Sequence, residues 1–222
     1  MANIMAASKI AQERKKMVAI IDYDAGNIKS VEKAVNYLGS EAVLSRDREE
    51  ILSADHIILP GVGNFGDAME KINGFGLGDV IREAVDAKKP FLGICLGLQL
   101  MFESSEESPG VKGLSLLPGE IVRIPDKEGL KIPNIGWNSL SFPVGGRLFA
   151  GLEEGAYVYF VHSYYLRAKE PSTVTAVTEY STLIHASVEK GNLFACQFHP
   201  EKSSKTGLKI LKNFLEIEST EG

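Results

Sequence analysis

The chain has 222 residues, of which 44% are hydrophobic and 24% are charged, and its formal net charge is −5 at pH 7. This composition is typical of one globular domain with a full core, and the negative charge disfavours a nucleic-acid partner or an acidic membrane surface. No run of 18 apolar residues is present, so the sequence predicts no membrane span.

The N-terminal segment and the cysteines limit the domain organisation. Residues 1–16 carry no apolar segment of the signal-peptide type, and we expect them to form an exposed or disordered extension. Residues 17–222 show no repeat, low-complexity segment or linker, so they are predicted to form one domain. Two cysteines, Cys95 and Cys196, in a chain without a signal peptide indicate a reducing, cytoplasmic compartment and no disulfide framework.

Strand-like and helix-like segments alternate in the first half of the chain. In chain order, the periodicity predicts strands over 17–22, 41–45, 56–60 and 91–94, with helices over 26–39, near 48–54 and over 76–89 between them. From about Gly119 the segments become shorter and richer in β-formers, at 120–124, 158–165, 174–180, 185–190 and 193–198, before an amphipathic helix over 203–217. This order predicts an α/β fold: a central, mostly parallel sheet with helices on both faces and antiparallel strands added in the C-terminal half.

The segment around Cys95 has the pattern of a nucleophile elbow. The predicted strand over 91–94 turns directly into a helix, and glycines lie two residues before and two after the cysteine, at Gly93 and Gly97. Such a corner exposes its central side chain at the carboxyl edge of the sheet and crowds the positions around it. The following helix would favour the thiolate of Cys95, and the amide of Leu96 would face an oxyanion formed on a bound substrate. A small buried residue in an ordinary βα turn is the alternative interpretation.

A cysteine nucleophile needs a base and a group that orients the base. His199 lies in the motif CQFHPEKS, where Pro200 favours an extended conformation at the histidine. Residues two apart in an extended chain share a face. Glu201 would therefore hold one imidazole nitrogen of His199 and leave the other facing Cys95.

The other histidines and the second cysteine that we can place in predicted strands are expected to have structural roles. His56 opens a predicted strand, His185 lies inside another, and Cys196 falls in a strand-like segment where a small core residue is expected. The four histidines are dispersed and no Cys/His cluster has ligand spacing, so no metal site is predicted.

A glycine-rich segment, PGVGNFGDAM, follows the predicted strand over 56–60. Its glycines at positions 61, 63 and 66 match the spacing of a dinucleotide-binding fingerprint, although the segment follows the third strand and lacks the expected acidic residue further on. In the second interpretation, backbone amides of Gly61 and Val62 complete an oxyanion site beside Cys95. The glycines would also let this backbone change conformation at low steric cost.

Motifs spread along most of the chain resemble one enzyme family. GICLGLQL and QFHPEKS are similar to segments of the class I glutamine amidotransferases, whose glutaminase domains use a catalytic triad. IIDYDAGNIKSVEKA, LPGVGNFGDAM, IPNIGWN and YFVHSYY further resemble the glutaminase-subunit family of imidazole glycerol phosphate synthases. The resemblance extends over about residues 17–215.

The resemblance implies hydrolysis of L-glutamine to L-glutamate and ammonia, without a cofactor. The implied triad is Cys95 as nucleophile, His199 as acid and base, and Glu201 as the orienting group. The implied oxyanion site consists of Gly61, Val62 and Leu96. The residues implied in glutamine binding are Gly63, Gln99, Glu107, Ser163 and Tyr164.

The resemblance also implies a partner. Members of the family form a heterodimer with a (β/α)8-barrel cyclase subunit, through which ammonia reaches a nucleotide; the products are imidazole glycerol phosphate and an aminoimidazole carboxamide ribotide, in L-histidine biosynthesis. The implied docking face comprises Pro133, Asn134, Trp137, Tyr159 and Lys202. Asn134 departs from the histidine that the family commonly has at this position. Glutamine hydrolysis is expected to be weak alone and strong once the liganded partner locks the Pro60–Gly63 segment.

Alternative functions share some of these features. A glutaminase component of a different amidotransferase, or a stand-alone cysteine hydrolase, would keep the elbow and the triad without this cyclase partner. A non-catalytic dinucleotide-binding module would use GVGNFG and leave the Cys95, His199 and Glu201 set as coincidence. That module would be stabilised against heat by NAD.

Overall fold

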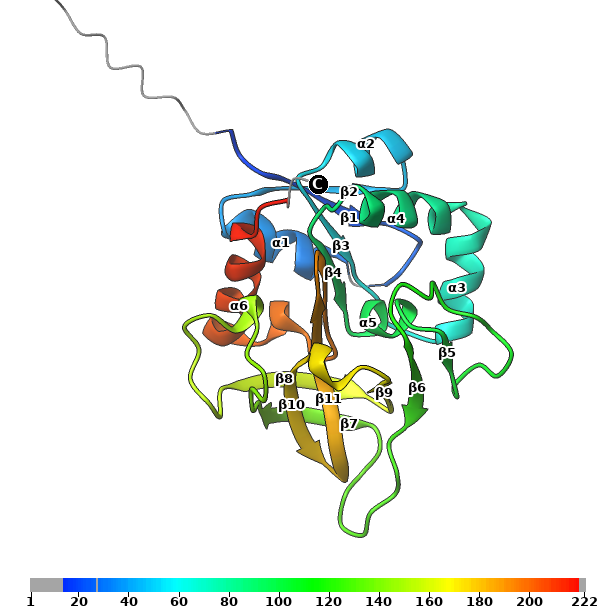
Figure 1. The fold of residues 1–222 in the computed structure, drawn as a ribbon, viewed down its shortest axis with the longest axis vertical. Coiled ribbons are helices and arrows are strands. Elements are labelled where there is room, and N and C mark those ends of the chain that lie inside the picture. The colour runs from blue at the N-terminus through cyan, green and yellow to red at the C-terminus, as the bar shows by residue number, and fades with distance from the viewer. Residues whose placement is uncertain (1–13, 27, 220–222) are drawn as a thin grey trace, which may run out of the picture.

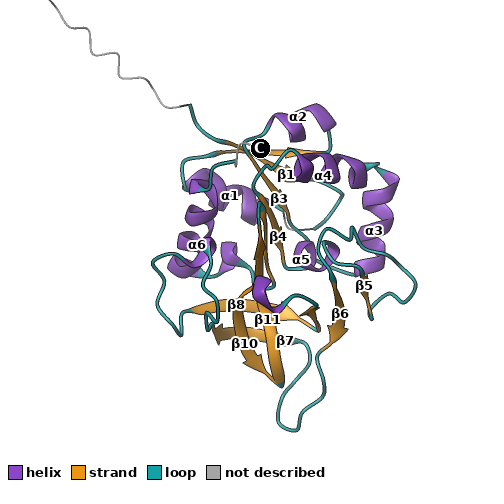
Figure 2. Cartoon of the chain, viewed as in Figure 1, coloured by secondary structure: helices purple, strands orange, loops and turns teal. Residues whose placement is uncertain are grey.

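The computed structural model describes residues 14–26 and 28–219, which form layers of helices around a central sheet (Figures 1 and 2). The strands are β1 (Met17–Ile21), β2 (Glu41–Ser45), β3 (His56–Leu59), β4 (Phe91–Ile94), β5 (Ser104–Ser105), β6 (Gly119–Arg123), β7 (Asn134–Ser139), β8 (Tyr157–His162), β9 (Tyr164–Ala168), β10 (Val174–Tyr180), β11 (Thr182–Lys190) and β12 (Leu193–Cys196). The α-helices are α1 (Lys29–Tyr37), α2 (Arg48–Ser53), α3 (Phe65–Gly74), α4 (Leu77–Asp86), α5 (Leu96–Leu100) and α6 (Ser204–Glu216). The extension predicted over 1–16 falls largely on residues 1–13, which lie outside the described residues.

The sheet changes from parallel to antiparallel pairing at β12. Five strands lie in the order β2-β1-β3-β4-β12, and every neighbouring pair among them is parallel. The order continues through β11, β9, β6 and β5, where β11 is antiparallel to β12 and β9, β9 is antiparallel to β6, and the short edge strand β5 is parallel to β6. β10 pairs with β11, while β7 and β8 form a separate antiparallel pair. The predicted α/β fold with antiparallel additions is confirmed.

Both faces of the parallel half are covered, as parallel strands require. Ala19 and Ile21 of β1 belong to a core with α2 to α5, whereas Val18 and Ile20 belong to the opposite core with α1 and α6. One strand serves two apolar layers because successive side chains point to opposite faces. Figure 1 shows α1 and α6 on one side of β3 and β4, and α3 and α5 on the other.

The single strand predicted over 158–165 is interrupted at Ser163, so that prediction is wrong. On one side of the break β8 pairs with β7, and on the other side β9 joins the main sheet. The carbonyl of Ser163 accepts a hydrogen bond from the amide of Ile124 at 2.9 Å, which fixes the crossing point. Periodicity does not reveal this change of partner, because strand-forming residues lie on both sides of the break.

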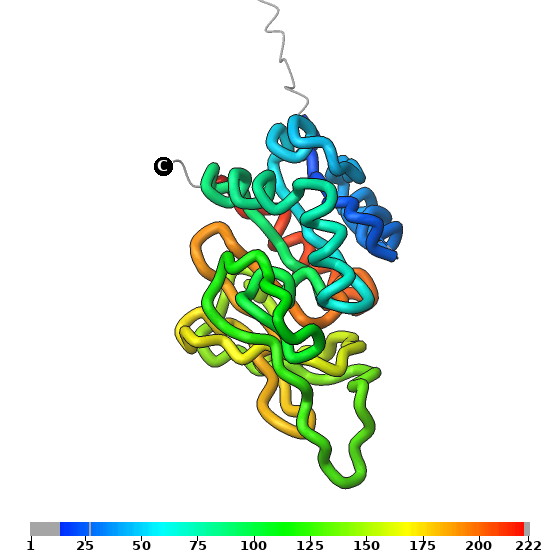
Figure 3. The backbone as a smooth tube through the Cα atoms, turned by 90° about the vertical axis from the view of Figure 1, so that its right-hand side faces the viewer, coloured from blue at the N-terminus to red at the C-terminus, as the bar shows by residue number. Residues whose placement is uncertain are grey.

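The β7–β8 pair is another feature that the sequence did not predict, since β7 was not assigned as a strand. In this pair Trp137 lies opposite Tyr159, with ring centroids 6.0 Å apart, and Ile135 lies opposite Val161. The connection from β6 to β7 projects at the end of the molecule far from the described N-terminal residues (Figure 3). Within residues 14–26 and 28–219, no helix has the length and apolar character needed to cross a membrane.

Candidate active site

Cys95 occupies the corner between β4 and α5. Its backbone has φ 55° and ψ −108°, a conformation with positive φ that residues other than glycine adopt rarely and at a cost in free energy. The strand and helix on either side hold the residue in this conformation. The amide of Leu96 begins α5, and the first amides of a helix have no acceptor within the helix.

The two glycines of the elbow are required by close approaches of the backbone. A Cβ atom on Gly97 would lie 1.8 Å from the carbonyl oxygen of Leu59, at the end of β3. A Cβ atom on Gly93 would lie 2.6 Å from Sδ of Met101 and 2.8 Å from the carbonyl oxygen of Gly97. The helix therefore packs against β3 and β4 at a distance that only glycine permits.

His199 reaches Cys95 because β12 is the parallel neighbour of β4. Cys196 pairs with Ile94, and the amide of Cys95 donates a hydrogen bond to the carbonyl of Cys196 at 2.8 Å. The carboxyl ends of parallel strands meet at one edge of a sheet, so the residues that follow both strands lie together. The amide of His199 donates to the carbonyl of Tyr159 at 2.9 Å, which ties it to β8.

Glu201 contacts His199 by a local geometry that differs from the predicted one. His199 is extended, with φ −100° and ψ 96°, but the three residues after it, Pro200–Lys202, form a 3-10 turn instead of continuing the extended chain. The turn places Oε1 of Glu201 2.8 Å from Nδ1 of His199. Both side chains are 3% exposed. Because a carboxylate accepts hydrogen bonds, Nδ1 carries the hydrogen and donates it to Glu201.

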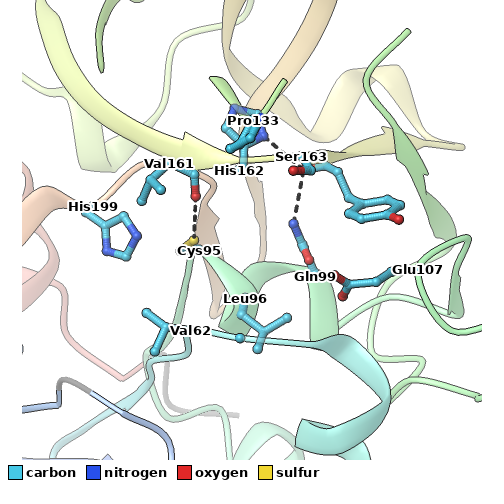
Figure 4. A pocket seen from close by; sticks show the side chains of 12 residues that line it. Val62, Cys95, Leu96, Gln99, Glu107, Pro133, Val161, His162, Ser163 and His199 are labelled. Atoms are coloured by element: carbon cyan, nitrogen blue, oxygen red, sulfur yellow. Dashed lines mark hydrogen bonds between the residues drawn. The ribbon is translucent and has the colours of Figure 1, made fainter. Parts of the chain in front are cut away.

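The second imidazole nitrogen, Nε2, faces the thiol. Nε2 is buried and makes no hydrogen bond of ordinary length with any residue that the structure describes, and the ring points toward Cys95 in Figure 4. Burial alone would lower the pKa of His199, but interactions with Cys95 and Glu201 outweigh it and raise the pKa to about 9. An imidazole with this affinity for a proton can take one from a neighbouring thiol.

Cys95 and His199 open into one cavity of about 270 Å³. Its lining consists of Val62, Gly63, Cys95, Leu96, Gln99, Glu107, Pro133, Val161, His162, Ser163, Tyr164 and His199. Figure 4 shows Val62 and Leu96 on one side of Cys95 and Val161 on the other, with Gln99, Glu107 and Ser163 further along. All five residues expected to bind glutamine therefore line the same space as the expected nucleophile and base.

Gly61 differs from the rest of the expected oxyanion segment, since it does not line this cavity. A Cβ atom on Gly61 would lie 2.4 Å from Oη of Tyr23 and 2.9 Å from Cβ of Leu96. Oη of Tyr23 donates to the carbonyl of Pro60 at 2.9 Å. The first part of the segment is thus held by packing, whereas Val62 and Gly63, the latter with φ +104°, border the cavity.

Two polar residues of the lining are anchored by the protein itself. Nε2 of Gln99 donates to the carbonyl of Tyr164 at 3.1 Å and to Oε1 of Gln197 at 3.2 Å. Oε2 of Glu107 accepts from the amide of Phe65 at 2.7 Å, at the beginning of α3.

The expected docking face is only partly exposed. Trp137 is 50% exposed, Pro133 is exposed, and Tyr159 and Lys202 are half-buried. Asn134 is 2% exposed, so its side chain does not lie on the surface of this chain, and its place in the docking face stays a prediction. The pairing of β7 with β8 turns this side chain inward, where Nδ2 lies 3.3 Å from Nε2 of His162.

His162 is a cavity residue to which sequence reasoning assigned no role. Nδ1 donates to the carbonyl of Tyr164 at 2.9 Å, which leaves Nε2 to accept from Asn134. Burial lowers the pKa of His162 to about 4, against a smaller opposing effect of the Tyr164 carbonyl. A sequence signal existed, because Val158 and Phe160 alternate with Tyr157 and Tyr159, and this alternation predicts that His162 shares the buried face of Val158 and Phe160.

His162 is expected to make folding sensitive to acid. Its pKa in the folded chain, about 4, is lower than that of an unfolded histidine, about 6.5. Between these values the unfolded chain binds a proton that the folded chain does not, so the free energy of unfolding falls by about 3 kcal/mol as pH decreases through that window. Urea unfolding at several pH values should show that His162→Gln flattens this dependence. His185→Gln, at a half-buried site, should change it much less, and an unchanged pH dependence in His162→Gln would contradict the assignment.

Comparisons with known proteins agree with this geometry. A sequence model described as glutamine amidotransferase class-I matches residues 19–217. The chain is 51% identical over 200 residues to the imidazole glycerol phosphate synthase subunit HisH of Moorella thermoacetica, covering 90% of this chain and 94% of that protein. The HisH subunit of Methanocaldococcus jannaschii is 47% identical over 201 residues, covering 90% and 100%.

Solved structures show the same fold at lower identity. A crystal structure described as a glutamine amidotransferase has a TM-score of 0.70 at 21% identity, covering 90% of this chain and 97% of that one. PurLQS from Thermotoga maritima has a TM-score of 0.70 at 20% identity, covering 91% and 98%.

Fold, elbow and sequence thus lead to one class of protein: the chain belongs to the class I glutamine amidotransferases. Within that class, the identity of about half over nearly the whole length places it in the family of imidazole glycerol phosphate synthase HisH subunits.

Proposed function

We propose that this chain hydrolyses L-glutamine at Cys95 and supplies the ammonia to the cyclase subunit of an imidazole glycerol phosphate synthase, in L-histidine biosynthesis in the cytoplasm. One observation carries the proposal. The elbow cysteine at the end of β4 and the His199–Glu201 pair after the adjacent β12 meet at one cavity, in a chain that is half identical to HisH subunits.

The first half of the reaction forms a thioester. His199 takes the proton from the Cys95 thiol at Nε2 while Sγ attacks the carboxamide carbon of glutamine. The carbonyl π electrons move to the oxygen and then return as the C–N bond breaks. His199 delivers its proton to the departing nitrogen, which leaves as ammonia, and Glu201 keeps the imidazole oriented by accepting from Nδ1.

The second half releases glutamate. His199 removes a proton from a water molecule, whose oxygen attacks the thioester carbon. The C–S bond breaks and the sulfur leaves as thiolate. His199, which still holds the proton from water, and the Cys95 thiolate are then ready to share that proton as before the reaction. In both halves the oxyanion lies near the amide of Leu96 at the start of α5 and the backbone of Val62, with Gly61 holding that segment in place.

The far end of the cavity suits the α-groups of glutamine. The carboxylate of Glu107 would attract the α-ammonium group, and Gln99, Gly63 and the backbone at Ser163 and Tyr164 would supply hydrogen-bonding partners around it. The anchoring of Glu107 by the Phe65 amide keeps its charge at a fixed distance from Cys95.

The partner is a cyclase subunit, which we propose to be a (β/α)8 barrel. Ile135, Trp137 and Tyr157 lie exposed on the β7–β8 pair. Pro133 and Val161 of the same region line the cavity, so a protein docked here would cover the route by which ammonia leaves. Docking against Val62 and Gly63 would fix the open part of the oxyanion segment, and this would raise hydrolysis when the liganded partner binds.

Glutamate release from glutamine tests the proposal, measured with and without a cyclase subunit and its nucleotide. We expect weak release from the chain alone and strong release with the liganded partner. Equal rates under both conditions would contradict the coupling, and the absence of release under every condition would contradict the glutaminase activity.

A docking-face variant is expected to weaken assembly. Trp137→Ala removes a large exposed ring that packs against Tyr159, and we expect it to cost about 2 kcal/mol, or roughly thirtyfold in Kd for the cyclase subunit. Leu44→Ala is the control, since Leu44 is 37% exposed on β2, which is an edge strand of the main sheet and belongs to neither β7 nor β8. Titration calorimetry with both variants measures the difference, and equal Kd values would place the partner elsewhere.

A further inference from the structure

We propose that Gln197 is a positioning residue that holds both the sulfur of Cys95 and the amide of Gln99. The inference rests on the proposed function in one respect, namely that Cys95 is the nucleophile. Gln197 directly follows β12 and is fully buried. It lies two residues before His199, in a position that the sequence analysis assigned to neither catalysis nor binding.

The orientation of the Gln197 amide follows from a chain of hydrogen bonds that begins at a backbone carbonyl. The carbonyl of Tyr164 can only accept, so the group that approaches it at 3.1 Å must be the NH2 of Gln99. The same NH2 group lies 3.2 Å from Gln197, which must therefore present its oxygen to it. The NH2 of Gln197 is then left to face Sγ of Cys95, at 3.8 Å.

This orientation gives the sulfur a donor. A hydrogen bond from an amide N–H is stronger to a thiolate than to a thiol, so Gln197 favours the nucleophilic form of Cys95. This hydrogen bond acts in addition to His199, which transfers protons as the acid and base of the reaction. Because the Gln197 donor is neutral, it assists the sulfur without exchanging a proton.

The orientation also decides what Gln99 offers to a ligand. Both hydrogens of the Gln99 NH2 group are taken by the protein, one by Tyr164 and one by Gln197. The oxygen of Gln99 is therefore the group that remains for the cavity, as an acceptor. This oxygen would accept a hydrogen bond from a donor on glutamine, such as its ammonium or amide N–H. Gln197 thus sets which end of the Gln99 amide faces the substrate, although Gln197 itself does not contact the substrate.

Two substitutions separate the two roles. Gln197→Met keeps the approximate volume and removes both hydrogen bonds. Gln197→Glu keeps an oxygen that accepts from Gln99 but, once ionised, replaces the donor to sulfur by a negative charge. Ser187→Ala is the matched control, because the Ser187 hydroxyl is fully buried in the adjacent β11 and donates to the carbonyl of Ala195 without contacting Cys95.

The primary measurement is the rate of Cys95 alkylation by iodoacetamide over a range of about pH 6 to 9, which reads the thiolate directly. We expect Gln197→Met and Gln197→Glu to slow alkylation about tenfold near pH 7 and to move its half-maximum to higher pH. Ser187→Ala should retain the wild-type profile. An unchanged profile in both Gln197 variants would overturn the assignment, even if the protein had no glutaminase activity.

Steady-state kinetics with the liganded cyclase subunit provide the second measurement. Gln197→Glu should lower kcat about tenfold or more and leave KM for glutamine within about twofold, since Gln99 remains held. Gln197→Met should lower kcat and raise KM several-fold. Equal KM values in the two variants would overturn the role toward Gln99. A wild-type enzyme without glutaminase activity would refute the proposed function and leave the alkylation result to decide the role of Gln197 toward the sulfur.

Discussion

Cys95→Ala is expected to abolish glutamate release, by a factor of about 10⁴ or more in kcat, while the chain remains folded. No other side chain in the cavity supplies a nucleophile held against an imidazole, so the covalent route is lost entirely. The substitution adds no steric conflict at the elbow, because alanine is smaller than cysteine. The melting temperature should therefore stay within a few degrees of the wild-type value.

Cys196→Ala provides the matched control for this loss. Cys196 is fully buried on β12, and burial raises the pKa of its thiol well above the ordinary value, so it stays protonated and unreactive. Its removal should cost about 1 kcal/mol of stability through a small cavity and preserve most of the hydrolysis. Substantial activity in Cys95→Ala, or its loss in Cys196→Ala, would exchange the roles of the two cysteines.

Gly97→Ala is expected to be the most destabilising single-methyl change in the elbow. The added Cβ atom would lie 1.8 Å from the carbonyl oxygen of Leu59, which belongs to the backbone of β3 and has no rotamer to change. Either α5 or the end of β3 must shift, at an expected cost of about 3 kcal/mol or more, equivalent to roughly 6–12 °C in melting temperature. Since α5 carries Leu96 and Gln99, hydrolysis should fall as well.

Gly74→Ala is the corresponding control in another helix. Apart from its chain neighbours and its own helix backbone, no atom of the described residues lies within 4 Å of a Cβ built on Gly74, at the end of α3. Alanine should be neutral or slightly stabilising there because it restricts the unfolded chain. Calorimetry measures the melting temperatures of both variants. A Gly97→Ala protein as stable as Gly74→Ala would show that α5 is not held against β3 as described.

The fold was largely predictable because local patterns carry most of it. Alternating buried strands and amphipathic helices predict parallel strands, and the Gly93 and Gly97 spacing predicts the corner at Cys95. The motifs led us to expect His199 beside Cys95, but the reason for it, that β12 is the neighbour of β4, appears only in the structure. Strand order is set by long-range packing, and no local pattern in either segment specifies it.

The site contacts that the sequence did not reveal join segments that lie far apart in the chain. Gln99 meets Gln197 across 98 positions and Tyr164 across 65, so no spacing links them. Asn134 is buried because β7 pairs with β8 in one particular register, and the residue type alone would suggest an exposed position. The burial of His162 follows from the same pairing.

Covalent labelling shows directly whether Cys95 attacks a glutamine carboxamide. A glutamine analogue carrying a diazoketone in place of the carboxamide would be incubated with the complex of chain, cyclase subunit and nucleotide, and the digested chain analysed by mass spectrometry. We expect one label per chain, on the peptide that contains Cys95, with loss of hydrolysis in proportion to labelling and protection by glutamine. Inactivation with the label on Cys196, or without any label on Cys95, would contradict this expectation.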